Sequence, residues 1–326
     1  MSIYPLDISD DGALSNAYLI ECAANEQARP GWLGIGAEAR ALGWRANDGW
    51  TNHLIGAWDH TTLLGFAASM TSDDVPDTTW IFTWVHPEHQ GRGLGTALVR
   101  AAEKESPQQT TRFVTSAYRR TLDEIAALEN HFVGPLGYTA ATTETVVELD
   151  LQSSRLVHPA AIDGYTVSTY INGVPERFRE QVGQLKGLVD AEAPNGELGW
   201  SETTVSPAEY ASEIDLWVAQ RSTVIESIAV DSDGDVAAWT CLVTANTANK
   251  PAHIEGTLVL NQHRGHGLGA AVKLASLDSA RALGNIQFVR TSSDDQNTWM
   301  RSINAAIGFV PVETEVLFQK IRTAAE

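Results

Sequence analysis

Two short glycine-rich stretches contain the residues whose types and spacing could support ligand binding or catalysis. Residues 85–96 read VHPEHQGRGLGT, and residues 259–270 read VLNQHRGHGLGA. Each stretch follows a run typical of a strand and opens a pattern typical of a helix. Alternating glycines let the backbone turn tightly and bring its N–H groups close to a ligand. The free N–H groups and the dipole of the first helical turn then favour an anion such as a pyrophosphate.

The alternative interpretation of each stretch is a plain tight turn from strand to helix. Two features weigh against it: the stretch occurs twice, and basic residues surround it in an acidic chain. These residues are Arg92, Arg100, His263, Arg264, His266 and Lys273. Neither stretch carries the lysine of a phosphate-binding G-x-x-x-x-G-K-[ST] loop. Neither has the third glycine of the dinucleotide fingerprint.

An internal duplication explains why there are two stretches. The triplet Leu136-Gly137-Tyr138 follows the first stretch at nearly the distance at which Ile307-Gly308-Phe309 follows the second. Two landmarks with nearly one spacing indicate a repeated domain. The sequence therefore predicts one domain over residues 1–150, a linker over 151–164 that is rich in turn-forming residues, and a second domain over 165–326.

Both halves show the same order of expected elements. In the first half we expect helices at 13–29, 96–105 and 121–132, and strands at 53–58, 62–70, 78–85, 112–117 and 142–150. In the second half we expect strands at 223–230, 235–243, 252–260, 286–292 and 312–320, and helices at 268–283 and 297–306. Aromatic and β-branched runs between turn residues predict the strands, and apolar residues at helical spacing predict the helices.

Composition narrows the class of protein. The chain has 326 residues, of which 43% are hydrophobic and 19% charged, so it is long enough for about two folded domains and too apolar to be disordered. Its net charge of -19 argues against nucleic-acid binding. That charge either favours a cationic or neutral substrate or serves solubility. The two cysteines, Cys22 and Cys241, have no metal-ligand spacing, and we expect no metal.

No export signal and no membrane-length apolar run is recognisable in the sequence, so we expect a soluble, cytoplasmic protein with no membrane partner.

At the glycine stretches the chain resembles the GNAT acetyltransferase superfamily, whose signature is V-x-x-x-x-[QR]-x-x-G-x-[GA] before a long helix. The second half adds a pattern similar to the downstream motif of that family, through Thr291, Asn297, Met300, Asn304 and the Ile307-Gly308-Phe309 triplet. The layout is similar to that of the tandem mycothiol synthase group. The resemblance implies an α/β (α+β) fold of two tandem GNAT domains. Each would be a mixed, mostly antiparallel sheet flanked by helices and splayed beside its fourth strand.

The resemblance also implies acetyl-CoA as co-substrate, lying in the splay. Its pyrophosphate would take the loop N–H groups, and its pantetheine arm would bond to the preceding strand. The residues implied in the first half are Thr83, Trp84, Val85, Gln90, Gly91, Arg92, Gly93, Leu94, Gly95 and Thr96. Those implied in the second half are Thr257, Leu258, Val259, Arg264, Gly265, His266, Gly267, Leu268, Gly269, Ala270 and Asn297. For Asn297, an N-cap of the next helix is the alternative.

The implied reaction is direct attack of an amine on the acetyl thioester, which needs a group to accept a proton. Glu255 and His253 lie two apart in an expected strand and so share a face. His253 stands where many family members carry a catalytic glutamate. Either residue could serve as base, with Glu255 alternatively orienting the histidine, or both could be ordinary strand residues. Asn304 stands at the position of the family's general-acid tyrosine, where it could donate a hydrogen bond to the leaving thiolate but no proton.

The first half offers Thr79 and Val133 at the corresponding positions, so we expect the chemistry in the second half and a CoA-binding or structural role for the first. Asp190, Glu192 and Glu197 either contact the acceptor or form a solvated loop. The leading hypothesis is an acyl-CoA-dependent N-acetyltransferase that acts on a small-molecule primary amine as a monomer or homodimer. The alternatives are a CoA-binding regulatory or scaffold protein without turnover, and a protein lysine or N-terminal acetyltransferase.

Overall fold

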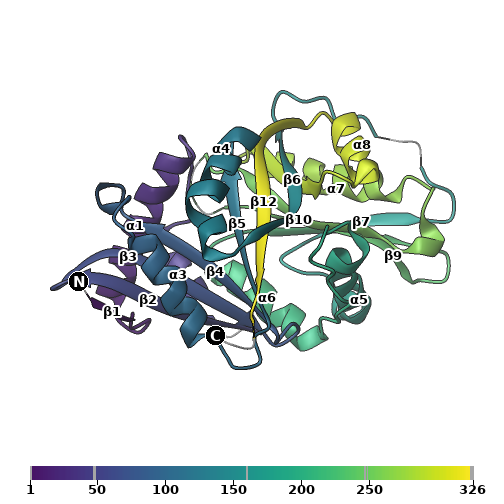
Figure 1. Cartoon of the computed structure of the whole chain (residues 1–326). Coiled ribbons are helices and arrows are strands. Elements are labelled where there is room, and N and C mark those ends of the chain that lie inside the picture. The colour runs from purple at the N-terminus through teal and green to yellow at the C-terminus, as the bar shows by residue number, and fades with distance from the viewer. Residues whose placement is uncertain (1, 47–48, 159–160, 246, 248, 324–326) are drawn as a thin grey trace. The chain divides into compact units, whose positions relative to one another are not determined.

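The computed structural model describes residues 2–46, 49–158, 161–245, 247 and 249–323, and it divides into two compact units (Figure 1). The N-terminal unit comprises residues 1–143 and 313–326, and the C-terminal unit comprises residues 144–312. Across the described residues the chain forms eight α-helices and twelve strands. The two units repeat one plan, and each is described separately below.

The N-terminal unit is a six-stranded sheet with helices on both faces. Its strand order is β1-β2-β3-β4-β5-β12. The strands are β1 (Ser2–Pro5), β2 (Trp50–Asp59), β3 (Thr62–Ser72), β4 (Thr78–Val85), β5 (Arg112–Arg119) and β12 (Val310–Ile321). The helices are α1 (Asp11–Ala28), α2 (Ala37–Arg45), α3 (Leu94–Glu105) and α4 (Leu122–Leu128), with short turns η1 (Pro87–His89), η2 (Glu129–Val133) and η3 (Gly134–Leu136).

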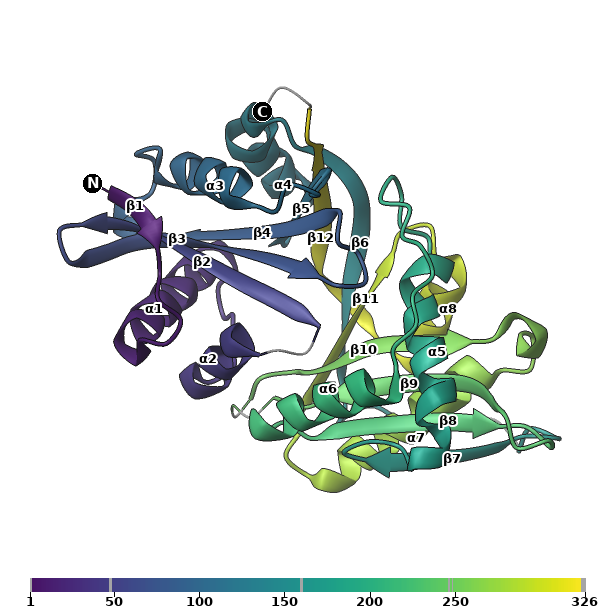
Figure 2. The ribbon, with the colours of Figure 1, turned by 90° about the horizontal axis from the view of Figure 1, so that it is seen from below.

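Two apolar clusters hold these layers together. Leu14 and Ile20 of α1 pack with Leu54 and Phe66 of the sheet on one face, and Leu98 of α3 belongs to the cluster on the other face. Figure 2 shows α1 and α2 on one side of β2, β3 and β4, and α3 on the other. Strands buried on both faces read as continuous apolar runs, which is why 53–58 and 62–70 are recognisable in the sequence.

The C-terminal unit has strand order β6-β11-β10-β9-β8-β7. Its strands are β6 (Thr139–Asp150), β7 (Thr166–Ile171), β8 (Val224–Val230), β9 (Val236–Val243), β10 (Ala252–Val259) and β11 (Phe288–Asp294). Its helices are α5 (Glu176–Glu192), α6 (Pro207–Ala219), α7 (Leu268–Leu283) and α8 (Thr298–Ile307), with a short turn η4 (Asn261–His263).

The two faces of this sheet carry different helices. Helices α5 and α6 pack with Trp239 and Leu258 on one face, and α7 and α8 pack with Ile254 and Val289 on the other. A capping box starts α6, because the Ser206 side chain accepts from the Glu209 N–H while Glu209 bonds back to the Ser206 N–H. Local sequence therefore sets where the helix begins, and burial of its apolar side sets where it docks.

The last strand of each half completes the sheet of the other half. Residues 144–150 of β6 pair antiparallel with β11, and residues 314–321 of β12 pair antiparallel with β5. The structural division therefore falls at 143 and again at 312, and it differs from the expected domains 1–150 and 165–326. The reason is that the strand-pairing partner of 142–150 lies far along the chain.

The expected linker 151–164 has no helix or strand in its described part, and its residues 159 and 160 lie outside the described residues. It is nevertheless packed at its start. Leu151 is fully buried, and Arg281 of α7 donates to the carbonyls of Leu151 and Ser154.

The expected fold class is confirmed: an α/β structure of two matching domains. None of the helices in the described part of the chain has the length and apolar character needed to cross a bilayer.

Candidate active site

Both glycine stretches form an open turn that leads into a helix. Gly265 and Gly267 have φ of 84° and 78°, and Gly91 and Gly93 have φ of 70° and 80°, in the left-handed region that glycine adopts readily. The N-cap residues of α3 and α7 are Gly93 and Gly267, which have no side chain to cap the helix. The N–H groups of the first turn therefore remain available.

Space and side chains around the turns fit an anionic ligand. A Cβ added at any of these four glycines would meet no atom within 4 Å, so ligand atoms can approach the backbone. Gln90 donates to the Val85 carbonyl at 2.9 Å, and Arg264 donates to the Val259 carbonyl at 3.1 Å. Gln90 and Arg264 occupy equivalent positions in the two loops, and each side chain connects its loop to the strand that precedes it. The pyrophosphate of acetyl-CoA suits this cradle of N–H donors.

Beside each loop the sheet is splayed. Strands β10 and β11 pair in parallel only at Ala252–Val289 and His253–Arg290, and β4 pairs with β5 only over residues 78–80. A β-bulge between Ile254 and Gly256 bends β10 where it leaves β11. The expected splay beside the fourth strand is present in both units.

The strand end in each splay offers a free main-chain donor. The Leu260 N–H bonds back to the Ala237 carbonyl at 3.0 Å, so the antiparallel alternation turns the N–H of Val259 towards the opening. His86 bonds in the same way to Leu64 at 3.0 Å, which turns the N–H of Val85 outward. The expected strand residues of the two copies thus lie where the opening begins. They are Thr83, Trp84, Val85, Thr257, Leu258 and Val259.

Glu255 is the extra residue of the bulge and lies on the face that α5 and α6 cover. Its side chain is exposed, yet the surrounding protein desolvates the carboxylate and raises its pKa, and the nearby Glu213 carboxylate raises it further. His253 is also exposed and precedes Ile254, which packs on the α7 side, so alternation turns His253 to the face of Glu255.

On the face of the sheet where Glu255 lies, a partly buried ionic cluster joins α5 and α6 to the sheet. Lys186 pairs with Glu213, and its ammonium lies 5.4 to 5.7 Å from the rings of Tyr210, Trp217 and Trp239. Burial works to lower the pKa of Lys186, but Glu213, Cys241 and Glu226 together outweigh it, and the pKa is raised.

Glu226, fully buried on β8, lies beneath this cluster. It accepts hydrogen bonds from the Tyr210 hydroxyl and, at 2.9 Å, from Trp239 Nε1. Burial raises its pKa although these two bonds lower it.

Asn304 lies at the meeting of α7 and α8. It is 2% exposed, and its Oδ1 accepts a 2.7 Å hydrogen bond from the ammonium of Lys273, which is itself 1% exposed. Asn304 Nδ2 is buried with no hydrogen-bond partner among the described residues. Burial lowers the pKa of Lys273 to about 7. In the sequence, Lys273 is one of the basic residues around the glycine stretches, whereas the structure buries it.

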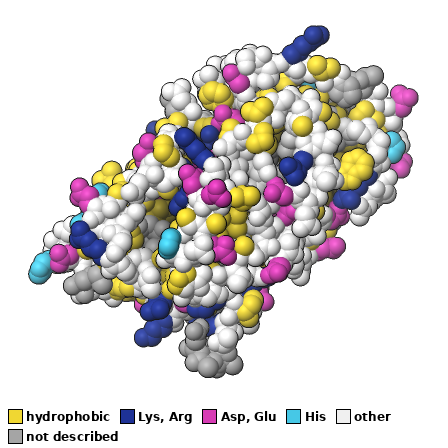
Figure 3. All heavy atoms as spheres, turned by 45° about the horizontal axis from the view of Figure 1, so that its top comes forward, with side chains coloured by type: hydrophobic (Ala, Val, Ile, Leu, Met, Phe, Trp, Pro, Cys, Tyr) yellow, Lys and Arg dark blue, Asp and Glu magenta, His cyan; other side chains and the backbone are white. Residues whose placement is uncertain are grey.

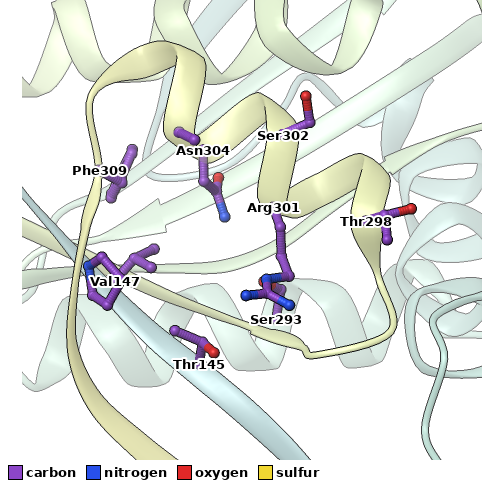
Figure 4. Close-up of a pocket in the computed structure, with 10 residues that line it drawn as sticks. Thr145, Val147, Ser293, Thr298, Arg301, Ser302, Asn304 and Phe309 are labelled. Atoms are coloured by element: carbon purple, nitrogen blue, oxygen red, sulfur yellow. The ribbon is translucent and has the colours of Figure 1, made fainter.

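A cavity of about 380 Å³ lies beside Asn304, between α8 and strands β6 and β11. Figure 4 shows the Asn304 amide reaching into it between Phe309 and Arg301. The Ser293 hydroxyl on its wall is also buried with no partner in the described part of the chain. The cavity therefore offers polar atoms that water or a ligand can satisfy.

Other expected residues have local partners. The Asn297 side chain accepts a hydrogen bond from the Met300 N–H at 3.1 Å, so Asn297 caps α8. This is the role that the sequence offered as the alternative to a cofactor contact. Glu192 at the end of α5 pairs with Arg264 of the glycine loop. Burial raises the pKa of Asp190 and that of Glu144, and the Asp190 carboxylate adds a smaller upward shift to the pKa of Glu144.

The N-terminal splay carries no comparable ionisable pair among its described residues. Thr79 is fully buried and shares a 2.8 Å hydrogen bond with Thr110. The rings of Trp80, Phe82 and Trp84 stack at 6.1 Å spacing along β4. The face of β4 in the N-terminal unit is therefore aromatic, whereas the equivalent strand of the C-terminal unit, β10, carries Glu255.

One group with metal-ligand chemistry exists among the described residues. The potential ligand atoms of His86, Glu88 and His89, just before the first glycine loop, lie within 4.8 Å of one another. Our expectation of no metal stays a prediction.

Comparisons with known proteins agree with this geometry. The sequence pattern of the Acetyltransferase (GNAT) family matches residues 19–128 and 192–308, so the chain belongs to this family. No curated protein sequence matches the chain. Membership makes it an acyl-CoA-dependent N-acyltransferase, and proteins of this family use acetyl-CoA.

Solved structures show the same two-domain fold. A tandem GNAT protein from the clavulanic acid biosynthesis pathway is 20% identical with a TM-score of 0.80, and the match covers 100% of this chain and 99% of that one. A GCN5-related N-acetyltransferase from Sphaerobacter thermophilus is 18% identical with a TM-score of 0.65, over 98% and 95% of the two chains. These likenesses show the fold, and the two family matches within this chain show that it has two GNAT domains.

Proposed function

We propose that the protein transfers an acetyl group from acetyl-CoA to the primary amine of a small molecule, and that the chemistry takes place in the C-terminal unit. The observation that carries this proposal is the position of Glu255. It is an exposed carboxylate with a raised pKa, at the bulge where β10 leaves β11, on the strand that ends at the open glycine loop. The N-terminal splay has no such residue, and we assign that unit a CoA-binding or structural role.

Each step of the transfer has a candidate group on β10 or in the glycine loop that follows it. Glu255 accepts the proton that an ammonium must lose before it can attack, and a raised pKa makes a carboxylate a better base near neutral pH. His253, on the same face, is the alternative base. The free N–H of Val259 faces the opening and can stabilise the oxyanion that forms on the thioester carbonyl. The loop N–H groups of 264–270 hold the phosphates.

Charge around Glu255 favours a cationic acceptor. Asp190 lies on α5, which covers this face, whereas Glu213 on α6 is paired with Lys186. The chain as a whole carries a net charge of -19. Acidic side chains are interspersed with basic and neutral ones over the face drawn in Figure 3, so that face has a mixed character. Glu255 and Asp190, together with the overall negative charge, are therefore expected to select an ammonium group.

The test is release of the CoA thiol from acetyl-CoA in the presence of amine panels, with wild type, Glu255→Gln and Gly267→Asp. We expect turnover with small primary amines, and a loss of turnover in both variants. Turnover only with peptides that present a lysine or a free N-terminus would indicate a protein acetyltransferase instead. Tight acetyl-CoA binding without turnover on any amine would indicate a regulatory or scaffold protein.

A further inference from the structure

The buried lysine between α7 and α8 has no structural need for a charge. Lys273 makes one hydrogen bond, to Asn304, and no carboxylate pairs with it among the described residues. Ser227 on β8, which accepts a hydrogen bond from Ser276 of α7, is a polar group that this face of the sheet presents to the helix, and it is uncharged. Two apolar side chains of similar size would join the helices at a lower desolvation cost.

The position of Lys273 places it beside the splay. It lies one turn beyond Gly269 on the same face of α7. A Cβ at Gly269 would lie 3.4 Å from Val259 of β10 and 3.4 Å from Ile303 of α8, so the first turn of α7, the end of β10 and α8 converge here. Lys273 reaches from this point to Asn304 on α8.

We propose that Lys273 donates the proton that the leaving CoA thiolate needs, with Asn304 holding its ammonium in place. This rests on the proposed function, which brings the thioester into the splay. The amine of the acceptor forms the new C–N bond and the C–S bond breaks. The thiolate takes a proton from the Lys273 ammonium. Glu255 takes the first proton of the acceptor ammonium before attack and releases it to solvent, and it then takes the second proton that the nitrogen loses as the amide forms. Solvent then reprotonates Lys273, and the cavity beside Asn304 offers a route for that proton.

The acid–base properties of the two groups agree with this direction of transfer. Burial lowers the pKa of Lys273 to about 7, whereas an alkyl thiol such as cysteine has a pKa of about 8.5. Transfer of a proton from the Lys273 ammonium to the sulfur is therefore favourable in free energy. Asn304 itself could donate a hydrogen bond to the thiolate but has no proton to give, so the lysine that it holds is the donor.

The direct test is the pH dependence of kcat, measured as release of CoA from acetyl-CoA at a saturating concentration of the amine. Only the ammonium form of Lys273 can donate a proton, so we expect wild-type kcat to fall by up to tenfold per pH unit above about pH 7, and we expect no such fall in Lys273→Met. The control is Arg177→Met, which removes an exposed cation at the start of α5 that lies over the Phe178 ring. It is expected to keep the wild-type pH dependence of kcat.

A second variant separates chemistry from packing. Lys273→Gln removes the charge but can still hydrogen-bond to Asn304. We expect it to lower kcat as much as Lys273→Met does, with an unchanged KM for acetyl-CoA, and to remove the alkaline fall in kcat that deprotonation of Lys273 causes. An alkaline fall in kcat that persists unchanged in Lys273→Met would overturn the proposal, and so would full activity of Lys273→Gln. Failure of acetyl-CoA to bind to wild type, or binding without turnover on any amine, would instead refute the proposed function itself.

Discussion

Replacing Gly267 by aspartate tests the assignment of the C-terminal glycine loop. Gly267 immediately precedes α7 with φ of 78°, and open space surrounds it. A left-handed conformation costs most residues about 1–2 kcal/mol, less for Asp and Asn, so the variant is expected to fold. A carboxylate about 4 Å from a phosphate adds a repulsion of about 1–4 kcal/mol between aqueous and protein-surface dielectrics. CoA affinity in this unit should therefore fall by roughly fivefold to a thousandfold.

Gly267→Asn is the matched control, because it has the same shape and the same tolerance of the left-handed region but no charge. Calorimetric titration of acetyl-CoA gives the affinity and the number of sites per chain. We expect the aspartate to remove one site or weaken it well beyond the effect of asparagine. Gly93→Asp, the equivalent change in the N-terminal unit, reports whether that loop binds CoA as well. If Asp and Asn at position 267 bind acetyl-CoA equally, the loop does not hold the phosphates.

Three further outcomes follow from the same structure. Glu255→Gln is expected to lower turnover by about 10²–10⁴-fold at unchanged CoA affinity. Because a base acts only when deprotonated and the pKa of Glu255 is raised, the acid limb of wild-type kcat/KM should lie above the ordinary glutamate value of about 4.3, as a pH–rate profile would show. Tyr210→Phe removes a donor from the buried Glu226 and should lower the free energy of unfolding by about 1–3 kcal/mol. The raised pKa keeps Glu226 protonated at low pH, where the lost donor matters less, so denaturant melts should show the larger loss at higher pH; an equal loss at every pH would contradict this. Leu277→Ala in the α7 core should cost about 2–5 kcal/mol, whereas Leu283→Ala, 44% exposed on the same helix, should stay within about 0.5 kcal/mol.

Much of the candidate site was accessible from the sequence, because its loops depend on local chemistry. Alternating glycines at 265 and 267 specify a turn that few other residues adopt, and the turn needs no distant partner to be recognised. The splay beside β10 followed from the resemblance to the family. The two-residue period of a strand predicted that His253 and Glu255 share a face, but the bulge at Glu255 interrupts that period.

Other features of the site were not accessible, because distant segments create them. The bulge at Glu255 is a register shift against β9 and has no marker within 252–260. Lys273 looked like a surface residue beside a loop, and only its contact with Asn304, on another helix, reveals a buried amine. A lysine at a helix position where apolar residues are expected was the one available signal.

The sequence alone determined that the chain contains two copies of one domain, where each anion-binding loop lies, and which elements surround it. These properties come from residue conformations and from periodicities that extend over a few turns or strands. Only the tertiary structure decided that residues 144–150 complete the second sheet and residues 314–321 the first. Strand pairing uses main-chain N–H and C=O groups that every residue except proline carries, so the choice of partner is left to the packing of the whole unit.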